Sequence, residues 1–328
     1  MIFTSSIYKL TAYALLGVFF CSIMGCKKDV LYPASTDVVN TGAVADINSI
    51  FFVNDTLGYV AGGEKYESTE LLTTYDGGKT WQRFYKEGND SKTVNSIAYT
   101  GTKIIAAGYE GKVYTQKGDP NDWLTTQMPD WVWFQHITFA SPNKGFIVSG
   151  EGYAPGNIYS IDSSLNFKMT DSLPFQLCDI SFANEMTGYT CGYGAMMKTS
   201  DGGNTWQLQN IQGDFFRSLS VVDAQNVWAA GYNGTIIHTK DGGAHWEKQR
   251  NGDDPLLTKY RFRGIIFKDL NTGYAVGDKG LIVKTIDGGA HWSLFQKTTD
   301  EDLKCITLQK DGSLWIGGSD GLVLHIKE

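Results

Sequence analysis

The chain has 328 residues, of which 42% are hydrophobic and 19% charged, so it can bury a sizeable core and is not disordered by charge. Its 28 Lys and Arg against 35 Asp and Glu give a net charge of −7, which excludes the basic footprint of a general nucleic-acid-binding protein. Aromatic residues make up 13% of the chain, which favours a β-rich fold.

The N-terminus has the features of an exported lipoprotein. An uncharged, mostly apolar run from Leu10 to Met24 is typical of a signal peptide and is too short for a comfortable membrane span. Ile23-Met24-Gly25-Cys26 then resembles a bacterial lipobox, which predicts a signal peptide over residues 1–25 and a lipid on Cys26. The alternative is an ordinary secretory signal that is cleaved near Gly25.

Residues 26–41 are predicted to be a lipid-anchored tether that ends in a strand of the main domain. Lys27-Lys28-Asp29 resembles the charged export signal of Bacteroidetes-type surface lipoproteins, and a plain flexible tether is the alternative. We therefore expect a lipid-anchored protein of the bacterial cell envelope, on the outer membrane and open to exposure at the cell surface.

A repeat defines the main domain, residues 42–328. The phrase Thr-x-Asp-Gly-Gly-x-(Thr/His)-Trp, which we call the box, occurs at residues 74–81, 199–206, 239–246 and 285–292, with a worn copy at 160–167. A glycine at the end of an apolar strand recurs about every 42 residues, at Gly62, Gly108, Gly150, Gly192, Gly231, Gly277 and Gly318. Seven members at this spacing predict an all-β, seven-bladed β-propeller of four-stranded blades.

The box has a structural interpretation. Its Asp can accept backbone N–H bonds across a turn, its glycines can supply positive φ angles, and its Trp can pack on neighbouring strands. We therefore expect a structural role, and no catalytic role, for the Asp and Trp of each box: Asp76, Trp81, Asp201, Trp206, Asp241, Trp246, Asp287 and Trp292.

The last unit stops after its third strand, at Ile326. We predict that the missing fourth strand comes from Tyr32–Val39, which closes the ring and removes exposed strand edges. Three cysteines remain in the main domain, Cys178, Cys191 and Cys305, which is an odd number for a disulfide framework. A bridge between Cys178 and Cys191 and two buried free thiols are the alternatives.

The boxes resemble the BNR/Asp-box repeat, and the phrase from Gly273 to Trp292 resembles the photosystem II stability/assembly factor-like family. The resemblance covers most of residues 42–328 and implies a propeller. It also implies a role in binding a membrane-protein assembly intermediate, without catalysis. One fold carries many functions, so the function is an expectation.

The starts of the first strands are predicted to lie at one mouth of the central channel. The residues in this column are Asn48, Asn95, Gln135, Cys178, Arg217, Arg263 and Lys304, with His136 beside them. Arg217 and Arg263 match the Arg-rich patch that the resemblance implies, whereas the first four residues do not. The turns after the second strands add Tyr109, Tyr193 and Tyr232, and Tyr with Arg is typical of binding hot spots. The alternative is that these groups only solvate the mouth or pair with Asp179 and Asp214.

Catalytic motifs are weak. Residues 317–321 match Gly-x-Ser-x-Gly, but the strand-turn-helix that a nucleophile elbow needs is not predicted there. The histidines of the boxes and third strands follow the repeat, so we expect no metal site and no cofactor. Sialidases share the box, but their Arg-Ile-Pro segment does not occur in the sequence. Glu110, Glu151, Asp179 and Asp278 are the candidate acids for a glycoside hydrolase.

We therefore predict a non-enzymatic envelope scaffold or assembly-factor-like lipoprotein. We expect this protein to be a monomer. Its binding residues are predicted to be Arg217, Arg263, Lys304, His136, Tyr109, Tyr193 and Tyr232. The expected partner is a segment of an envelope or membrane protein or an anionic glycan, with no nucleic acid. The alternative is a sialidase-like or other glycoside hydrolase that acts on extracellular glycans.

Overall fold

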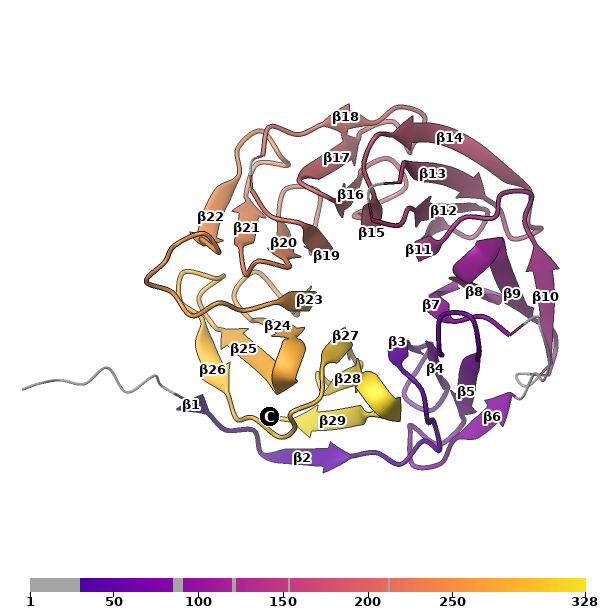
Figure 1. Cartoon of the computed structure of the whole chain (residues 1–328), viewed down its shortest axis with the longest axis horizontal. Helices are drawn as coiled ribbons and strands as arrows, with labels where there is room; N and C mark the ends of the chain where they lie inside the picture. Colours follow the sequence, from indigo (N-terminus) through magenta and orange to yellow (C-terminus); the bar gives the residue numbers. More distant parts are fainter. Residues whose placement is uncertain (1–29, 85–90, 120–121, 153, 212) are drawn as a thin grey trace, which may run out of the picture.

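The computed structural model describes residues 30–84, 91–119, 122–152, 154–211 and 213–328. These residues form 29 strands in seven sheets, together with three short 3-10 helices. The sheets stand around a central axis like the blades of a propeller, as Figure 1 shows along that axis. The predicted all-β, seven-bladed β-propeller is therefore confirmed, and each glycine of the repeat belongs to one blade. The predicted signal peptide and Cys26 lie outside the described residues.

The first four blades follow each other along the chain. Blade one consists of β3 (Ile47–Phe52), β4 (Gly58–Gly62), β5 (Glu70–Thr74) and β6 (Gln82–Phe84). Blade two consists of β7 (Val94–Tyr99), β8 (Ile104–Gly108), η1 (Tyr109–Gly111), β9 (Lys112–Gln116) and β10 (Trp123–Gln127). Blade three consists of β11 (Phe134–Ser141), β12 (Lys144–Ser149), β13 (Gly156–Ile161) and β14 (Phe167–Leu173). Blade four consists of β15 (Leu177–Phe182), β16 (Gly188–Gly192), β17 (Ala195–Thr199) and β18 (Gln207–Leu208).

The last three blades complete the ring. Blade five consists of β19 (Phe216–Val221), β20 (Val227–Gly231), β21 (Ile236–Thr239) and β22 (Glu247–Arg250). Blade six consists of β23 (Phe262–Phe267), β24 (Gly273–Gly277), η2 (Asp278–Gly280), β25 (Leu281–Thr285) and β26 (Ser293–Phe295). Blade seven consists of β27 (Leu303–Leu308), β28 (Leu314–Gly318), η3 (Ser319–Gly321), β29 (Val323–Lys327) and, from the N-terminal part of the chain, β2 (Ser35–Val38).

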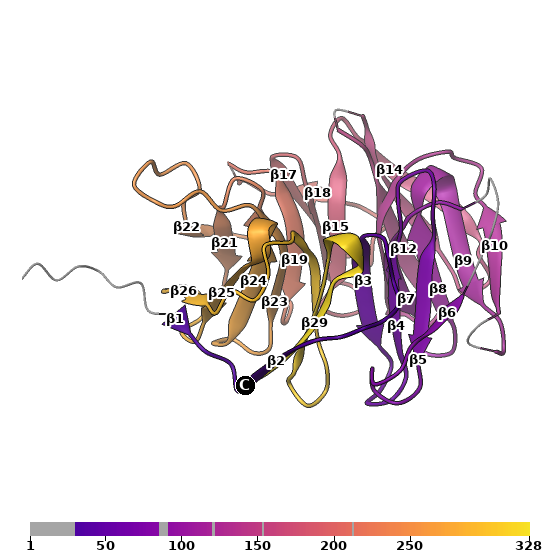
Figure 2. The ribbon, with the colours of Figure 1, turned by 60° about the horizontal axis from the view of Figure 1, so that its bottom comes forward.

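Strand register defines two faces of the ring. The start of each first strand pairs with the end of the second, as in Ile47 with Gly62 and Phe262 with Gly277. The first-strand starts and the turns between second and third strands therefore share one face, which we call the site face. The turns between third and fourth strands, which hold the boxes, lie on the opposite face. Figure 2 shows η2 and η3 at the same end of their blades.

The recurring glycine has a steric cause. A Cβ on Gly62 would collide with the backbone oxygen of Asp46, and a Cβ on Gly277 would collide with that of Arg261. Both oxygens belong to the residue just before a first strand, where two backbone segments approach closely. Glycine is therefore required where these two backbone segments meet, as it also is at Gly108 and Gly192.

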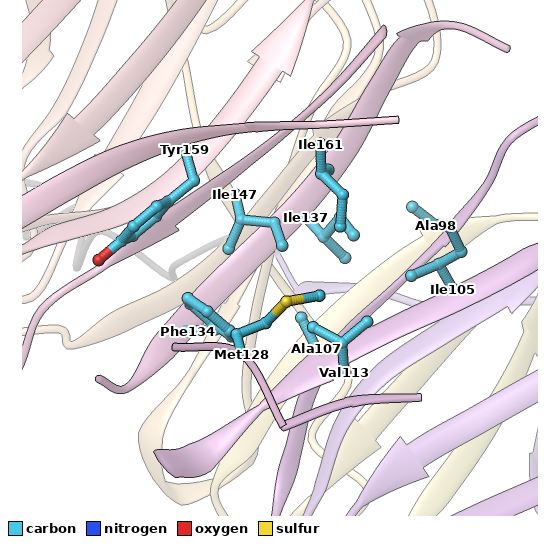
Figure 3. Close-up of a cluster of buried hydrophobic side chains, with 10 residues drawn as sticks. All are labelled: Ala98, Ile105, Ala107, Val113, Met128, Phe134, Ile137, Ile147, Tyr159 and Ile161. Carbon is cyan, nitrogen blue, oxygen red and sulfur yellow. The ribbon is translucent and has the colours of Figure 1, made fainter. Parts of the chain in front are cut away.

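The core is divided among the interfaces between blades. The described residues form seven buried hydrophobic clusters, each shared by two neighbouring blades. In the cluster of Figure 3, Ala98, Ile105 and Val113 of blade two pack with Phe134 and Ile147 of blade three. Because both faces of a blade are covered in this way, the central strands are apolar along nearly their whole length.

The four box turns have the predicted hydrogen bonds. In the first box, Asp76 accepts the backbone N–H of Thr80 at 2.9 Å and its hydroxyl at 2.7 Å, while Gly77 and Gly78 have φ angles of 73° and 88°. Asp201, Asp241 and Asp287 accept the equivalent backbone N–H at 2.9 Å. These hydrogen bonds lower the pKa of all four carboxyls to about 2.

The box tryptophans pack as predicted on neighbouring strands. Trp81 lies edge-on to Phe52 of its own blade and to Trp315 of blade seven. Trp206 contacts Phe146 of blade three, Trp246 contacts Tyr189 of blade four, and Trp292 contacts Phe267 of its own blade. The hydrogen bonds and ring contacts of these four boxes are therefore consistent with the predicted structural role.

The N-terminal strand closes the ring as predicted. β2 pairs antiparallel with β29, with Ser35 opposite Lys327 and Val38 opposite Leu324, and becomes the outer strand of blade seven. The sequence did not predict a second contribution. β1 (Val30–Leu31) pairs in parallel with β26 and adds a fifth strand to blade six. The N-terminal segment therefore joins two consecutive blades along their outer edges (Figure 1).

Candidate functional site

The inner strands of the seven blades surround a central cavity of about 820 Å³. Each inner strand has a β-bulge near its start, on the site face. The bulged residue is in every blade the one predicted from the sequence column: Asn48, Asn95, Gln135, Cys178, Arg217, Arg263 and Lys304. All seven line the cavity. A bulge redirects a side chain out of the regular alternation, which explains how a strand that packs on both faces also supplies a residue to the cavity mouth.

Most of the mouth's positive charge is paired within the chain. Lys304 forms an ion pair with Asp46 of the neighbouring blade. Arg263 forms an ion pair with Asp278, and its second guanidinium nitrogen lies 3.4 Å from Asp302. These two predicted binding residues therefore serve contacts between or within blades, and their cations are largely neutralised.

His136 is also paired. Its Nδ1 lies 3.2 Å from a carboxylate oxygen of Asp179 and 3.1 Å from the backbone oxygen of Ile180. The other oxygen of Asp179 accepts the backbone N–H of Leu219 at 2.8 Å. The alternative expected from the sequence, pairing with Asp179, therefore holds for His136.

Asp214 does not pair with a cation in the described structure. It is buried, and its carboxylate accepts backbone N–H groups of Phe215, Asn233 and Thr235 at 2.6 to 2.9 Å. It therefore fixes the turn between β20 and β21, next to Tyr232.

Arg217 differs from the other cations of the mouth. No carboxylate of the described residues lies within 4.0 Å of its guanidinium group. Its Nη1 lies 3.8 Å from the Cys178 sulfur, and its Cζ lies 5.3 Å from the centroid of the Phe215 ring. Burial raises the pKa of the Cys178 thiol to about 11, so this contact adds no negative charge near neutral pH. The hydrogen-bonding fork of Arg217 is thus available to an external anion.

A row of aromatic rings runs along the site face beside Arg217. Tyr193, Phe215 and Tyr232 lie in sequence across blades four and five, with ring centroids 5.4 and 6.4 Å apart. Arg261 donates a 2.9 Å hydrogen bond to the Tyr232 hydroxyl and lies over its ring at 4.8 Å. Tyr193 and Arg261 are 48% and 58% exposed, so both reach solvent. We call Tyr193, Phe215, Tyr232 and Arg261, together with Arg217, the arginine–aromatic patch.

Three of the residues predicted for binding thus lie on an open surface, whereas the others are paired or buried. Arg217, Tyr193 and Tyr232 come together in the arginine–aromatic patch. Tyr109 is only 7% exposed and packs between Tyr66 and Trp133, because its turn folds against blade three. It is therefore not free to act as an exposed hot spot.

Sequence reasoning missed Phe215 and Arg261. Both occupy the position just before a first strand, whose backbone oxygen bonds to the turn after the second strand, as the Tyr232 and Asp278 amides show. A column aligned two residues earlier than that of Arg217 and Arg263 would have included both.

The candidate hydrolytic acids all pair with a cation or with a protonatable group. Glu110 pairs with Lys92, Glu151 with Lys65, Asp179 with His136 and Asp278 with Arg263. Ser319 of the Gly-x-Ser-x-Gly match starts η3 and is followed by β29, so it lacks the helix of a nucleophile elbow.

Among the described residues no group of three His, Cys, Asp or Glu side chains could hold a metal ion. In that same part of the chain, no helix has the length and apolar character to cross a membrane.

Cys178 and Cys191 lie on adjacent strands, as predicted, and are free thiols, as is Cys305. Burial raises the pKa of all three. They are therefore packing residues in the thiol form, Cys178 and Cys305 on first strands and Cys191 on a second strand.

Comparison with known proteins supports the resemblance seen in the sequence. Residues 164–252 and 255–328 match the family model described as photosynthesis system II assembly factor YCF48. A curated relative, the photosystem II assembly lipoprotein Ycf48 of Synechococcus sp. (strain CC9902), is 32% identical over 75 residues. That match spans 21% of this chain and 22% of the relative, so the chain aligns with about a fifth of the relative's length.

Solved structures extend the likeness to the whole ring. A structure of YCF48 bound to D1 peptide has a TM-score of 0.72 at 16% identity and covers 91% of this chain and 99% of its own. YCF48 from Cyanidioschyzon merolae has a TM-score of 0.70 at 16% identity, over 90% and 99%. Streptogramin B lyase, an enzyme by name, has a TM-score of 0.73 at 13% identity, over 89% and 97%. Likeness at these identities shows the fold alone. The whole ring therefore has the fold of these propellers, and residues 164–252 and 255–328 are similar to the photosystem II assembly factor family.

Proposed function

We propose that this assembly factor-like propeller is a binding protein that holds an acidic segment of an envelope protein against its arginine–aromatic patch. The observation that carries the proposal is the state of Arg217. It lies at the mouth of the central cavity without a carboxylate partner among the described residues, whereas Arg263, Lys304 and His136 are paired.

The chemistry of the patch favours an extended segment with a carboxylate. A guanidinium group binds a carboxylate through two parallel N–H···O bonds, and the pair is stronger beside apolar surface than in water. Tyr193, Phe215 and Tyr232 offer flat rings on which neighbouring side chains can pack. The YCF48 structure with a bound D1 peptide supports a protein segment as the ligand class.

The first experiment compares partner capture by four forms of the protein from detergent-solubilised envelope. The double variant Arg217→Ala/Arg261→Ala removes the patch cations, and Arg217→Lys keeps the charge but removes the fork. Lys240→Ala removes one positive charge from the opposite face of blade five, where its side chain is 68% exposed. We expect the double variant to lose about tenfold or more in affinity, Arg217→Lys to be intermediate, and Lys240→Ala to bind like the wild type.

A photo-crosslinking amino acid at Tyr193 identifies the captured protein directly, with the same amino acid at Leu208 as the control on the outer strand of blade four. Leu208 is 64% exposed against 48% for Tyr193, so it is at least as accessible. Equal capture by the wild type and the double variant would contradict the proposal. Capture of an anionic glycan in place of a protein would reassign the ligand class.

A further inference from the structure

A second cluster on the site face has the composition of an ammonium-binding site. The loop between β4 and β5, the start of η1 and the residue before β11 bring Tyr66, Tyr109 and Trp133 together from blades one, two and three. The Tyr66 and Tyr109 rings meet edge-on at 4.8 Å, and the Tyr109 and Trp133 rings meet edge-on at 5.1 Å. We call these three rings, with the Glu151 carboxylate beside them, the aromatic cage.

The aromatic cage is occupied by a side chain of its own chain. The Lys65 ammonium lies 4.5 Å from the Trp133 ring centroid, 5.1 Å from that of Tyr109 and 5.3 Å from that of Tyr66. It also forms an ion pair and a hydrogen bond with Glu151. The other lysines that contact rings in the described residues, Lys92, Lys198 and Lys284, each contact one ring. Three ring faces or edges around one ammonium group are the arrangement by which proteins recognise organic cations.

Tyr109 and Trp133 of the aromatic cage are more constrained by contacts than the Lys65 side chain that lies among the rings. Tyr109 is 7% exposed, and its hydroxyl lies 2.6 Å from that of Tyr66. The backbone oxygen of Trp133 accepts the Gly150 N–H at 3.1 Å, which ties this ring to blade three. Lys65, in contrast, lies on a loop. Its side chain is 37% exposed, and the side chain of Glu151 is 45% exposed. The ion pair between them is therefore the replaceable part of the cluster, because exposed pairs contribute little free energy.

The aromatic cage is accessible to a ligand at the cavity mouth. Lys65 and Trp133 line the central cavity, together with Arg217 from blade five. The ligand's ammonium group can therefore enter from the same space that serves the arginine–aromatic patch. We propose that the aromatic cage binds a primary alkylammonium group supplied by a ligand, as in a lysine side chain, and that Lys65 fills the site until that group replaces it.

Glu151 selects the kind of ammonium. A primary ammonium can donate a hydrogen bond to its carboxylate while its remaining surface lies against the rings, as Lys65 does. A quaternary ammonium has no N–H to donate. The aromatic cage is therefore expected to prefer a primary ammonium, whereas a cage without the carboxylate would prefer a quaternary one.

The test uses small probes and the full chain, so it does not depend on the proposed segment binding. The indole N–H of Trp133, which has no hydrogen-bond partner among the described residues, is the reporter in NMR titrations with n-butylammonium chloride. Sodium chloride at equal ionic strength is the blank. We expect Lys65→Ala to bind the probe in the millimolar range and about tenfold more tightly than the wild type, because the tethered Lys65 competes at high effective concentration.

Matched variants separate the contributions of the rings and the carboxylate. Lys65→Ala/Trp133→Phe keeps a ring in place and is expected to weaken the probe several-fold, and here the shifts of the Tyr66 and Tyr109 ring protons report binding. Lys65→Ala/Glu151→Gln is expected to weaken n-butylammonium more than tetramethylammonium. Lys198→Ala, which removes a lysine that contacts one ring outside the aromatic cage, that of Tyr189, is expected to leave the wild-type affinity unchanged.

Three results would overturn the proposal. One is the absence of a probe-specific shift in folded Lys65→Ala, and another is equal affinity in the wild type and Lys65→Ala. The third is tighter binding of tetramethylammonium than of n-butylammonium to Lys65→Ala, which would remove the primary-ammonium assignment. The melting temperature of each variant establishes that it is folded.

Discussion

At the scale of single residues, repeated positions of the blades carry matched pairs of side chains. Tyr189 lies opposite Lys198 in blade four and Tyr274 opposite Lys284 in blade six. In blades five and seven the aromatic residue is Trp and its partner is His: Trp228 with His238, and Trp315 with His325. The long lysines pass over the smaller Tyr rings, whereas the His rings stack flat on Trp, at 3.8 and 4.3 Å. Two histidines that resemble candidate metal ligands in the sequence are thus packing residues.

His238 makes the stability of the propeller depend on pH. It is 4% exposed, and burial, with a smaller effect of Lys240, lowers its pKa to about 4 against the opposing charge of Asp223. Between about pH 6.5 and 4 the unfolded chain therefore binds more protons than the folded chain, so the free energy of unfolding falls as the pH falls.

We predict that urea denaturation across this pH range shows a loss for His238 of at most about 3 kcal/mol. His238→Gln should reduce the slope, because its side chain does not titrate. A remaining slope of the same sign is expected from His325, whose pKa is also lowered by burial. An unchanged slope in His238→Gln would count against this explanation.

At the scale of elements, the ring is closed by a short strand from the other end of the chain. β2 has four residues, but it covers the edge of β29 that would otherwise expose unpaired backbone groups. The Val39 N–H donates to the Val323 oxygen at 2.8 Å. Because hydrogen-bonded pairs alternate in an antiparallel ladder, the N–H of Asp37 faces β29 and that of Thr36 faces away.

Proline substitutions test this closure. We predict that Asp37→Pro lowers the melting temperature by about 5 °C or more, because it removes a donor to β29, whereas Thr36→Pro has a much smaller effect. Differential scanning calorimetry of both variants measures the difference. If the two prolines were equally tolerated, β2 would not stabilise the ring through its ladder.

At the scale of the whole molecule, the predicted lipid and the first described strand constrain where the propeller stands. We propose that Cys26 carries the anchor. Three residues separate it from Val30, which pairs with the outer strand of blade six. The four steps from one Cα to the next between Cys26 and Val30 span at most about 14 Å when extended. The outer edge of blade six would therefore stay close to the membrane surface.

Cys26→Ser tests the anchor. Cells that produce the wild type should incorporate an alkynyl fatty acid into the protein and hold it in the membrane fraction, whereas Cys26→Ser should lose the label and leave that fraction. Cys305→Ser is a matched control that should retain both. Label on Cys26→Ser would exclude this residue as the lipid site, and absence of label on the wild type would favour the ordinary secretory signal.

The architecture could be predicted from the sequence because it depends on local, repeated chemistry. Each box needs an Asp and two glycines at set positions to make its turn, and each inner corner needs a glycine where two backbones meet, as at Gly62. The column that includes Arg217 also follows from the repeat, because each blade places its bulge at the same position. Ring closure by residues near Tyr32–Val39 follows from the strand missing from the last unit.

The state of each side chain in that column depends on contacts between blades, which the repeat does not encode. Lys304 pairs with Asp46, 258 positions away along the chain, and Arg263 with Asp278, so neither remains a free cation. Tyr109 is buried by Tyr66 and Trp133 from two neighbouring blades. A repeat specifies where a side chain begins, whereas its charge and exposure are set by whichever partners the closed ring brings within a few ångströms of it.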